Sequence, residues 1–323
     1  MKMNILKNVD LNLQPLTTIQ EELYKCFEKA IEEKSKDESI LLLYRATEYS
    51  KIEERLTNSN LKKENIFDRA FYFGEKAHFC SDNYKKKIFE DINDCSLITI
   101  GKIFDEIKYL LSEKRLKMRI KYLSKEFRNY FADVKNRENF ISILSDSDSH
   151  CKLLLRDYYL YLLHTGYTIK DDTPLVSTSI KRSKAKKFGN KDKQIIFYYF
   201  VSQPFECSII APWRISEVID LITQKNLPTY EPQGLYPEQD EISVKGGLFP
   251  QFILGIELVK ERKFIVNPHL FQYESLQFED LIQYGIGFDQ SDFAEEIKET
   301  KMSHSLHMDI DGCVSSMEHK VYK

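Results

Sequence analysis

The sequence predicts an α+β protein in which a long helical segment interrupts a strand-rich chain. Apolar residues recur at three- and four-residue spacing, with few helix breakers, from about residue 50 to residue 165. Short β-prone runs lie on both sides of that segment, one before residue 45 and several after residue 173. The hydrophobic fraction of 42% and the charged fraction of 30% are those of a folded globular protein. We therefore expect one domain over residues 1–323, with residues 50–165 as a helical insertion or lid.

The front of the chain is expected to form a capped helix followed by a buried strand. Residues 17–34 combine threonines at the start, glutamates in the first turn and one apolar face, which predicts a helix. The apolar run SILLLY at residues 39–44 is typical of a buried strand, and Arg45 follows it directly. A guanidinium beside a core strand packs poorly unless an anionic group receives it. Arg45 therefore indicates an anionic partner at the end of this strand.

The back of the chain is expected to alternate strands with short helices. The runs LVSTS at residues 175–179 and QIIFYYFV at residues 194–201 are rich in β-prone residues. The other expected elements are strands at residues 207–211, 252–259 and 263–267 and helices at residues 179–188 and 215–224. Residues 301–323 are polar, and we expect them to form a mobile tail.

Composition argues against several classes of protein. The net charge of −3 is too small to name a partner, so a nucleic-acid surface would have to be a local patch. No segment is apolar for long enough to cross a membrane and the N-terminus lacks a signal-peptide pattern, which predicts a cytoplasmic protein with no membrane partner. Six scattered cysteines without a CxxC pair predict reduced thiols. His304 and His307 could form a metal site with Asp309, Asp311 and Cys313. All five lie in the polar tail, where nothing fixes the geometry of ligands, so we expect no metal.

A turn-rich, acidic segment leads into a predicted strand at residues 236–249, YPEQDEISVKGGLF. Gln239 and Glu241 are two residues apart, so on an extended chain their side chains would point to the same face. A neutral hydrogen-bonding group beside one carboxylate suits chemistry in which positive charge develops on a substrate while a nucleophile is steered toward it. The alternative is a polar hairpin edge with no chemical role.

The order of three stretches of the chain resembles the motif order in the R-S-E branch of the ADP-ribosyltransferase superfamily. This branch includes many bacterial toxins that use NAD. They are LLLYRAT with Arg45, PLVSTSIKRSKAKKFG with Ser177, Thr178 and Ser179, and YPEQDEISV with Gln239 and Glu241. The resemblance covers about residues 38–50 and 170–262, and it implies a split β-sheet core. The helical insertion is longer than the segment that the family usually places between its Arg and its Ser-Thr-Ser motif.

The resemblance implies a role in NAD binding or catalysis for each matched residue. Arg45 would bind the NAD diphosphate through its planar fork of donors, with Ala46 standing where the family often has Gly. Ser177 would hydrogen-bond Glu241 and orient it, while Thr178 and Ser179 would shape the nicotinamide side of the cleft. Glu241 would accept a hydrogen bond from the 2′-hydroxyl of the nicotinamide ribose and stabilise the oxocarbenium-like transition state.

Further residues would contact the acceptor or the nicotinamide. By resemblance Gln239 would position the acceptor, and Tyr236 lies where the family carries an aromatic residue that touches the target. Gln in place of Glu at the first position of the pair argues against arginine-modifying members and toward those that modify asparagine or a nucleobase. Phe188 and Tyr198 are candidates for stacking near nicotinamide, with packing in the core as the alternative.

Two basic stretches bear on the nature of the acceptor. One is expected on a helix of the insertion, with Tyr122, Phe127 and Tyr130 interleaved, and the other follows the Ser-Thr-Ser motif. Phosphate contacts with stacking aromatics suit single-stranded nucleic acid, whereas solvated helix faces would leave a protein side chain as the acceptor. The basic residues are Lys114, Arg115, Lys117, Arg119, Lys121, Lys125 and Arg128 in the first stretch and Lys181, Arg182, Lys184, Lys186, Lys187, Lys191 and Lys193 in the second.

The sequence therefore predicts a mono-ADP-ribosyltransferase that uses NAD as a substrate and needs no metal. The resemblance and the absence of a secretion signal suggest a toxin that acts inside its own cell, in a toxin–antitoxin or antiphage system. The helical insertion could receive an antitoxin protein, recognise the target or gate the cleft. Two alternatives stay open: an NAD glycohydrolase, and a catalytically silent member of the fold that serves as a binding module.

Overall fold

The computed structural model describes residues 1–5, 13–37, 39–56, 66–77, 93–166, 173–202, 208–232, 235–272, 277–300, 302, 304–308 and 314–319. The chain divides into two compact units. The first unit contains Met1–Asp82, Val176–Ser208 and Gly246–Lys323, and the second contains Asn83–Leu175 and Ile209–Lys245. The boundaries differ from the predicted insertion, because the second unit is built from two separate stretches of the chain and begins well after residue 50.

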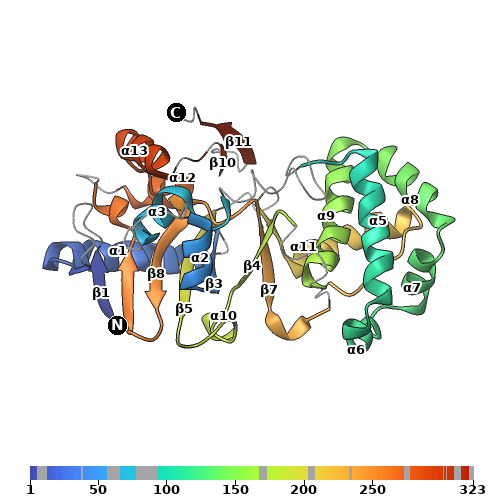
Figure 1. The fold of residues 1–323 in the computed structure, drawn as a ribbon, viewed down its shortest axis with the longest axis horizontal. Helices are drawn as coiled ribbons and strands as arrows, with labels where there is room; N and C mark the ends of the chain where they lie inside the picture. The colour runs from blue at the N-terminus through green and yellow to red at the C-terminus, as the bar shows by residue number, and fades with distance from the viewer. Residues whose placement is uncertain are drawn as a thin grey trace. The chain divides into compact units, whose positions relative to one another are not determined.

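A mixed sheet forms the core of the first unit (Figure 1). Its strands follow the order β2-β1-β9-β8-β5-β3-β4, and β1 runs parallel to β9 while the other pairings are antiparallel. A separate antiparallel hairpin joins β10 to β11. The strands are β1 (Lys2–Ile5), β2 (Gln14–Pro15), β3 (Ile40–Glu48), β4 (Leu175–Ser179), β5 (Gln194–Ser202), β8 (Ile253–Leu258), β9 (Lys263–Val266), β10 (His304–Met308) and β11 (Val314–Glu318).

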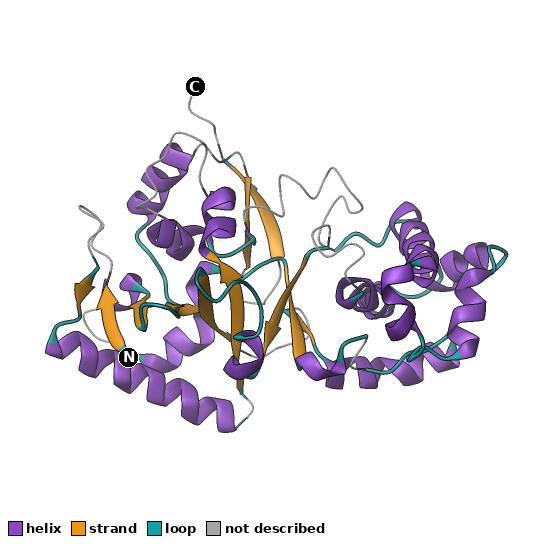
Figure 2. Ribbon diagram, turned by 60° about the horizontal axis from the view of Figure 1, so that its bottom comes forward, coloured by secondary structure: helices purple, strands orange, loops and turns teal. Residues whose placement is uncertain are grey.

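Helix α1 (Thr18–Lys36) covers one face of this sheet, as Figure 2 shows. Its start is fixed by a capping box, because Thr17 and Gln20 satisfy each other's backbone N–H groups. Phe27 packs edge-on against Phe200 of β5 with ring centroids 6.4 Å apart. The other helical segments of the unit are α2 (Tyr49–Leu56), α3 (Ile66–Phe73), α10 (Arg182–Ala185), α12 (Phe278–Tyr284), α13 (Gln290–Thr300) and the 3-10 turns η4 (Pro250–Phe252) and η5 (Pro268–Gln272).

The second unit is a helical bundle with a short two-stranded ladder (Figure 1). Helix α9 (Ser149–Thr165) is its core element, since every residue from Leu155 to Thr165 is buried. Phe104, Phe131 and Phe140 of the surrounding helices pack against one another beside it. The remaining elements are α5 (Leu97–Ser112), η2 (Lys114–Leu116), α6 (Lys117–Ile120), α7 (Lys125–Ala132), α8 (Asn136–Ser145), β6 (Ile209–Ile210), α11 (Pro212–Gln224), η3 (Pro237–Gln239) and β7 (Glu241–Lys245).

The α+β class is confirmed at the level of a large mixed sheet accompanied by many helices, and the specific split-sheet core stays a prediction. Strand β4 has the predicted bounds. Strand β3 continues three residues past Arg45 to Glu48, so Arg45 lies within the strand and not after it. Within the predicted tail at residues 301–323, β10 and β11 pair as an antiparallel hairpin, and the mobility of the tail stays a prediction. No helix in the described part of the chain is long and apolar enough to span a membrane.

Candidate active site

Arg45 is held by an ion pair inside the first unit. Its Nε lies 2.7 Å from Oε2 of Glu75, and its Nη2 lies 3.4 Å from Oε1. Its Nη1 donates to the carbonyl of Ser177 at 2.8 Å. The Arg45 side chain is 10% exposed and that of Glu75 only 1% exposed, so both charges depend on each other for stability. The anionic partner that the sequence predicts for Arg45 is therefore Glu75, a residue of the same chain.

The backbone around Glu75 is built to hold its carboxylate in place. Glu75 and Leu248 exchange both backbone hydrogen bonds at 2.9 Å. Gly74 and Lys76 on either side have φ values of 73° and 69°, in the left-handed region. A Cβ on Gly74 would stand 2.0 Å from the carbonyl oxygen of Leu248, so only glycine fits there. The sequence predicts no role for Glu75, and its one local signal is the glycine that precedes it.

The Ser-Thr-Ser motif lies on β4 beside Arg45. Ser179 is opposite Tyr44 of β3 in the antiparallel register, and its Oγ accepts from the backbone N–H of Lys181 at 3.2 Å. Thr178 and Ser179 are buried and Ser177 is half-buried. The hydrogen bond from Arg45 to the Ser177 carbonyl brings the first two predicted motifs together.

Tyr198 lies on the opposite face of the sheet from Arg45. The register places Tyr198 opposite Tyr44 and Phe197 opposite Arg45, and facing residues of an antiparallel pair share a face. Its hydroxyl donates to Oε2 of Glu257 at 3.0 Å, and burial raises the pKa of that hydroxyl. A cofactor held by Arg45 would lie on the other side of the sheet, so the placement favours core packing for Tyr198 over nicotinamide stacking.

The two remaining residues of the predicted cofactor set are only partly enclosed. Phe188 is half-buried in the loop before β5, where its carbonyl accepts a hydrogen bond from the side chain of Gln194. Ala46 is half-buried on β3, opposite Ile196. Ala46 follows Arg45 directly on the strand, so a methyl group stands where the family often has no side chain.

Glu241 opens strand β7 of the second unit, and its side chain is buried. His164 of α9 places Nε2 3.3 Å from Oε1 of Glu241, and Ser243 donates its hydroxyl to the same oxygen at 3.3 Å. The hydroxyl of Tyr161 donates to the backbone carbonyl of Glu241 at 3.2 Å. The Nδ1 atom of His164 lies 2.7 Å from the hydroxyl of Thr173. The predicted contact from Ser177 to Glu241 joins residues of different units and stays a prediction.

Gln239 and Glu241 do not share an extended segment, so that structural prediction is wrong. Gln239 ends the 3-10 turn η3, and Asp240 adopts a left-handed conformation with φ 49° before β7 begins. The i, i+2 rule for strands does not apply across such a kink. Asp is among the few residues that enter this region without large strain, which is why the chain can turn there.

Arg119 connects the first basic stretch with the loop before Glu241 in the second unit. Its guanidinium lies over the ring of Tyr236, 4.4 Å from the centroid. The same guanidinium binds the Glu238 carboxylate with both Nη atoms, at 2.6 and 3.2 Å. The predicted acceptor loop and residues 114–128 are therefore neighbours.

The two basic stretches differ from the prediction in their details. Residues 114–128 do not form one helix, because η2, α6 and α7 follow one another with a turn at residues 121–124. Phe127 is fully buried against Phe131, so it is a core residue and not a stacking platform, whereas Tyr122 is 65% exposed. In the second stretch Arg182 pairs with Glu257, with Nε and Oε2 2.8 Å apart, while the lysines at 186, 187, 191 and 193 are exposed.

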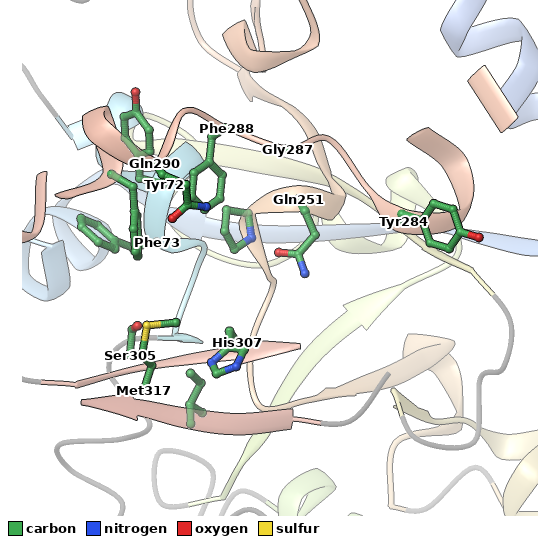
Figure 3. Close-up of a pocket in the computed structure, with 13 residues that line it drawn as sticks. Tyr72, Phe73, Gln251, Tyr284, Gly287, Phe288, Gln290, Ser305, His307 and Met317 are labelled. Carbon is green, nitrogen blue, oxygen red and sulfur yellow. The ribbon is translucent and has the colours of Figure 1, made fainter. Parts of the chain in front are cut away.

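A cavity of about 320 Å³ lies elsewhere in the first unit, and none of the predicted site residues lines it. Figure 3 shows Tyr72 and Phe288 on one side of it and His307 of β10 on another. The described residues contain no group of three or more His, Cys, Asp or Glu side chains that could hold a metal ion. His304 and His307 lie on β10, whereas Asp309, Asp311 and Cys313 fall outside the described residues.

No family model, no curated protein and no solved structure matches this chain. The assignment of function therefore depends on the residues and contacts described above.

Proposed function

We propose that the chain is an NAD-dependent mono-ADP-ribosyltransferase, which transfers ADP-ribose from NAD to a macromolecule and releases nicotinamide. The observation that supports this best is the hydrogen bond that joins Arg45 to the Ser-Thr-Ser strand. It brings the first two motifs of the resemblance into contact on the neighbouring strands β3 and β4. The third motif supplies Glu241, a buried carboxylate at the head of a strand.

Glu241 would act on the ribose of NAD. The bond between the ribose carbon C1′ and the nicotinamide nitrogen breaks, and its electron pair leaves with nicotinamide. The ribose then carries positive charge, which a fixed carboxylate attracts more strongly in the transition state than in the ground state. A nucleophilic atom of the acceptor forms the new bond to C1′ and loses its proton. Contacts from His164 and Ser243 to one oxygen of Glu241 support this role, because they fix the carboxylate before substrate binds.

Arg45 would contribute to binding of the NAD diphosphate. A guanidinium has five N–H donors, and the contacts to Glu75 and to the Ser177 carbonyl occupy three of them. Within the part of the chain that the structure describes, the remaining two donors would be left for phosphate oxygens. Glu75 would keep the guanidinium in a fixed orientation, at the cost of a negative charge close to the bound diphosphate.

The acceptor would be recognised by the second unit. Tyr236 and Gln239 would contact it, and the packing of Arg119 against Tyr236 supports a contribution from the basic residues 114–128. An exposed Tyr122 among exposed lysines suits single-stranded nucleic acid, and a protein acceptor is the other class. By resemblance to toxins of the R-S-E branch, the chain would act inside the cell, as a toxin or antiphage effector restrained by an antitoxin protein.

The test uses NAD labelled on the adenylate, whole-cell lysate and purified chain, with the Glu241→Gln variant as control. Macromolecular label that depends on Glu241 supports the proposal, and its loss to nuclease or to protease names the acceptor class. If the wild-type chain releases nicotinamide but no label enters a macromolecule, the result would point to an NAD glycohydrolase. If the wild-type chain neither transfers label to a macromolecule nor releases nicotinamide, the proposal is overturned.

A catalytically silent binding module is the second candidate, because Arg45 already has an anionic partner in Glu75. This reading predicts that NAD neither is cleaved nor protects the chain from thermal unfolding. Nicotinamide release from NAD by the purified chain, absent in Glu241→Gln, would exclude it.

A further inference from the structure

Three polar side chains of the buried helix α9 lie in a row along strand β7. Asp157, Tyr161 and His164 are spaced by four and three residues, so they share one face of the helix. Asp157 contacts the ammonium group of Lys245 at the end of β7, and Tyr161 and His164 contact Glu241 at its beginning.

The dimensions of the two elements agree with this pairing. Seven residues of helix rise about 10 Å, and four steps of a strand extend about 13 Å. The contacts at Lys245 and at Glu241 therefore follow α9 and β7 in opposite chain directions. The last of these contacts, at His164, is the one that reaches the carboxylate of Glu241.

The hydrogen-bond pattern at His164 indicates how its protons are arranged. A neutral imidazole has one donor nitrogen and one acceptor nitrogen, and an ionised carboxylate can only accept. Thr173 can donate its hydroxyl to Nδ1, 2.7 Å away, which leaves the proton on Nε2 facing Oε1 of Glu241. Ser243 donates to the same oxygen, so two donors converge on Oε1.

We propose that His164 is a positioning residue that holds the carboxylate of Glu241 in its reactive orientation, with Thr173 setting the tautomer of the imidazole. This inference rests on the proposed function, because it assigns a task to Glu241 in the cleavage of NAD. A carboxylate fixed by two donors cannot rotate freely about its last torsion angle, and a displacement of about 1 Å at a reacting group can cost a factor of about 100 in rate. His164 would thus act through Glu241 and not by contact with the substrate.

The experiment compares three variants of the full chain in steady-state release of nicotinamide from NAD. His164→Leu removes the donor, His164→Gln keeps an N–H near the position of Nε2, and Thr165→Val changes the next buried residue, whose hydroxyl bonds within its own helix to the Leu162 carbonyl. We expect His164→Leu to lower kcat by about 100-fold with little change in KM for NAD. His164→Gln should recover kcat to within about tenfold of wild type, and Thr165→Val should stay within about threefold.

Wild-type-like kcat in a folded His164→Leu variant would overturn the inference and leave the proposed function intact. An equal loss in His164→Leu and His164→Gln would also overturn it, because the donor would then be irrelevant. Absence of nicotinamide release by the wild-type chain would overturn the proposed function itself. If His164→Leu does not fold, the test passes to Thr173→Val, where a kcat loss of about tenfold is expected and none would contradict the assignment.

Discussion

Replacing Asp157 by Asn is expected to destabilise the second unit by about 4 kcal/mol, because the Asp157 carboxylate pairs with two buried cations, Arg156 and Lys245. The Arg156 Nε lies 3.0 Å from its Oδ1, and the ammonium of Lys245 contacts Oδ2. All three residues are at most 5% exposed. Burial tends to raise the pKa of Asp157, but the charges of Arg156 and Lys245 outweigh it and lower that pKa.

The magnitude follows from the charges that remain. Breaking a buried ion pair by removing one partner costs about 3–5 kcal/mol, and Asp157→Asn leaves two buried cations without their carboxylate. Lys245→Met is the matched control, since it removes one cation and leaves Arg156 paired with Asp157. We expect Lys245→Met to cost less than about 1.5 kcal/mol.

The single tryptophan makes the measurement specific to the second unit. Trp213 lies on α11 and is 39% exposed, so its fluorescence reports the unfolding of this unit. With a slope of about 2 kcal/mol per molar urea, a loss of 4 kcal/mol lowers the urea midpoint by about 2 M. Equal midpoints for Asp157→Asn and Lys245→Met would refute the reasoning, because the cost would then not depend on uncompensated charge.

Three further predictions concern the loop, a buried acid and a helix cap. Gln239→Ala should abolish label transfer to the acceptor while NAD cleavage continues, and parallel loss of both in a folded variant would contradict its role as an acceptor contact. Burial, reinforced by the charge of Asp68 and opposed by that of Arg69, raises the pKa of Glu296 from 4.5 to about 7. Between pH 4.5 and 7 the folded chain therefore keeps the proton on Glu296 and the unfolded chain loses it. The contribution of Glu296 to the free energy of unfolding is full below pH 4.5 and falls as the pH rises toward 7, by up to about 3 kcal/mol. Circular dichroism melts at pH 5 and 7.5 should show a smaller difference for Glu296→Gln than for wild type. Thr17→Ala should cost about 1 kcal/mol in the same melts through loss of the α1 cap, with an unchanged melting temperature counting against the capping box.

Elements with strong local signals could be predicted from the sequence. The start of α1 follows from a threonine cap with Gln20 at the third helical position. Strand β4 was predicted with its bounds, since the run LVSTS is β-prone and is bounded by a proline before it. Strand β1 was not predicted, because its parallel partner β9 lies far along the chain and its own four residues carry no alternation.

The site shows the same division between local and long-range information. The side-chain chemistry of Arg45 and Glu241 and their place in the motifs marked them as candidates. Glu75 and His164 are identified only from the folded structure, where they contact Arg45 and Glu241. His164 lies in the last turn of α9, where every residue is buried, so hydrophobic periodicity could not identify the residue that His164 contacts. The error at Gln239 arose because a left-handed Asp240 interrupts what reads as a strand.

The most direct test of the central claim is the rate of nicotinamide release from NAD by the wild-type chain, by Glu241→Gln and by Glu231→Gln, an exposed carboxyl of the same unit. Gln at 241 can keep hydrogen bonds to its neighbours but carries no charge. We expect it to reduce the rate by a factor of about 100 or more, with Glu231→Gln within about twofold of wild type. Release by Glu241→Gln at the wild-type rate, or none by the wild-type chain, would contradict the account.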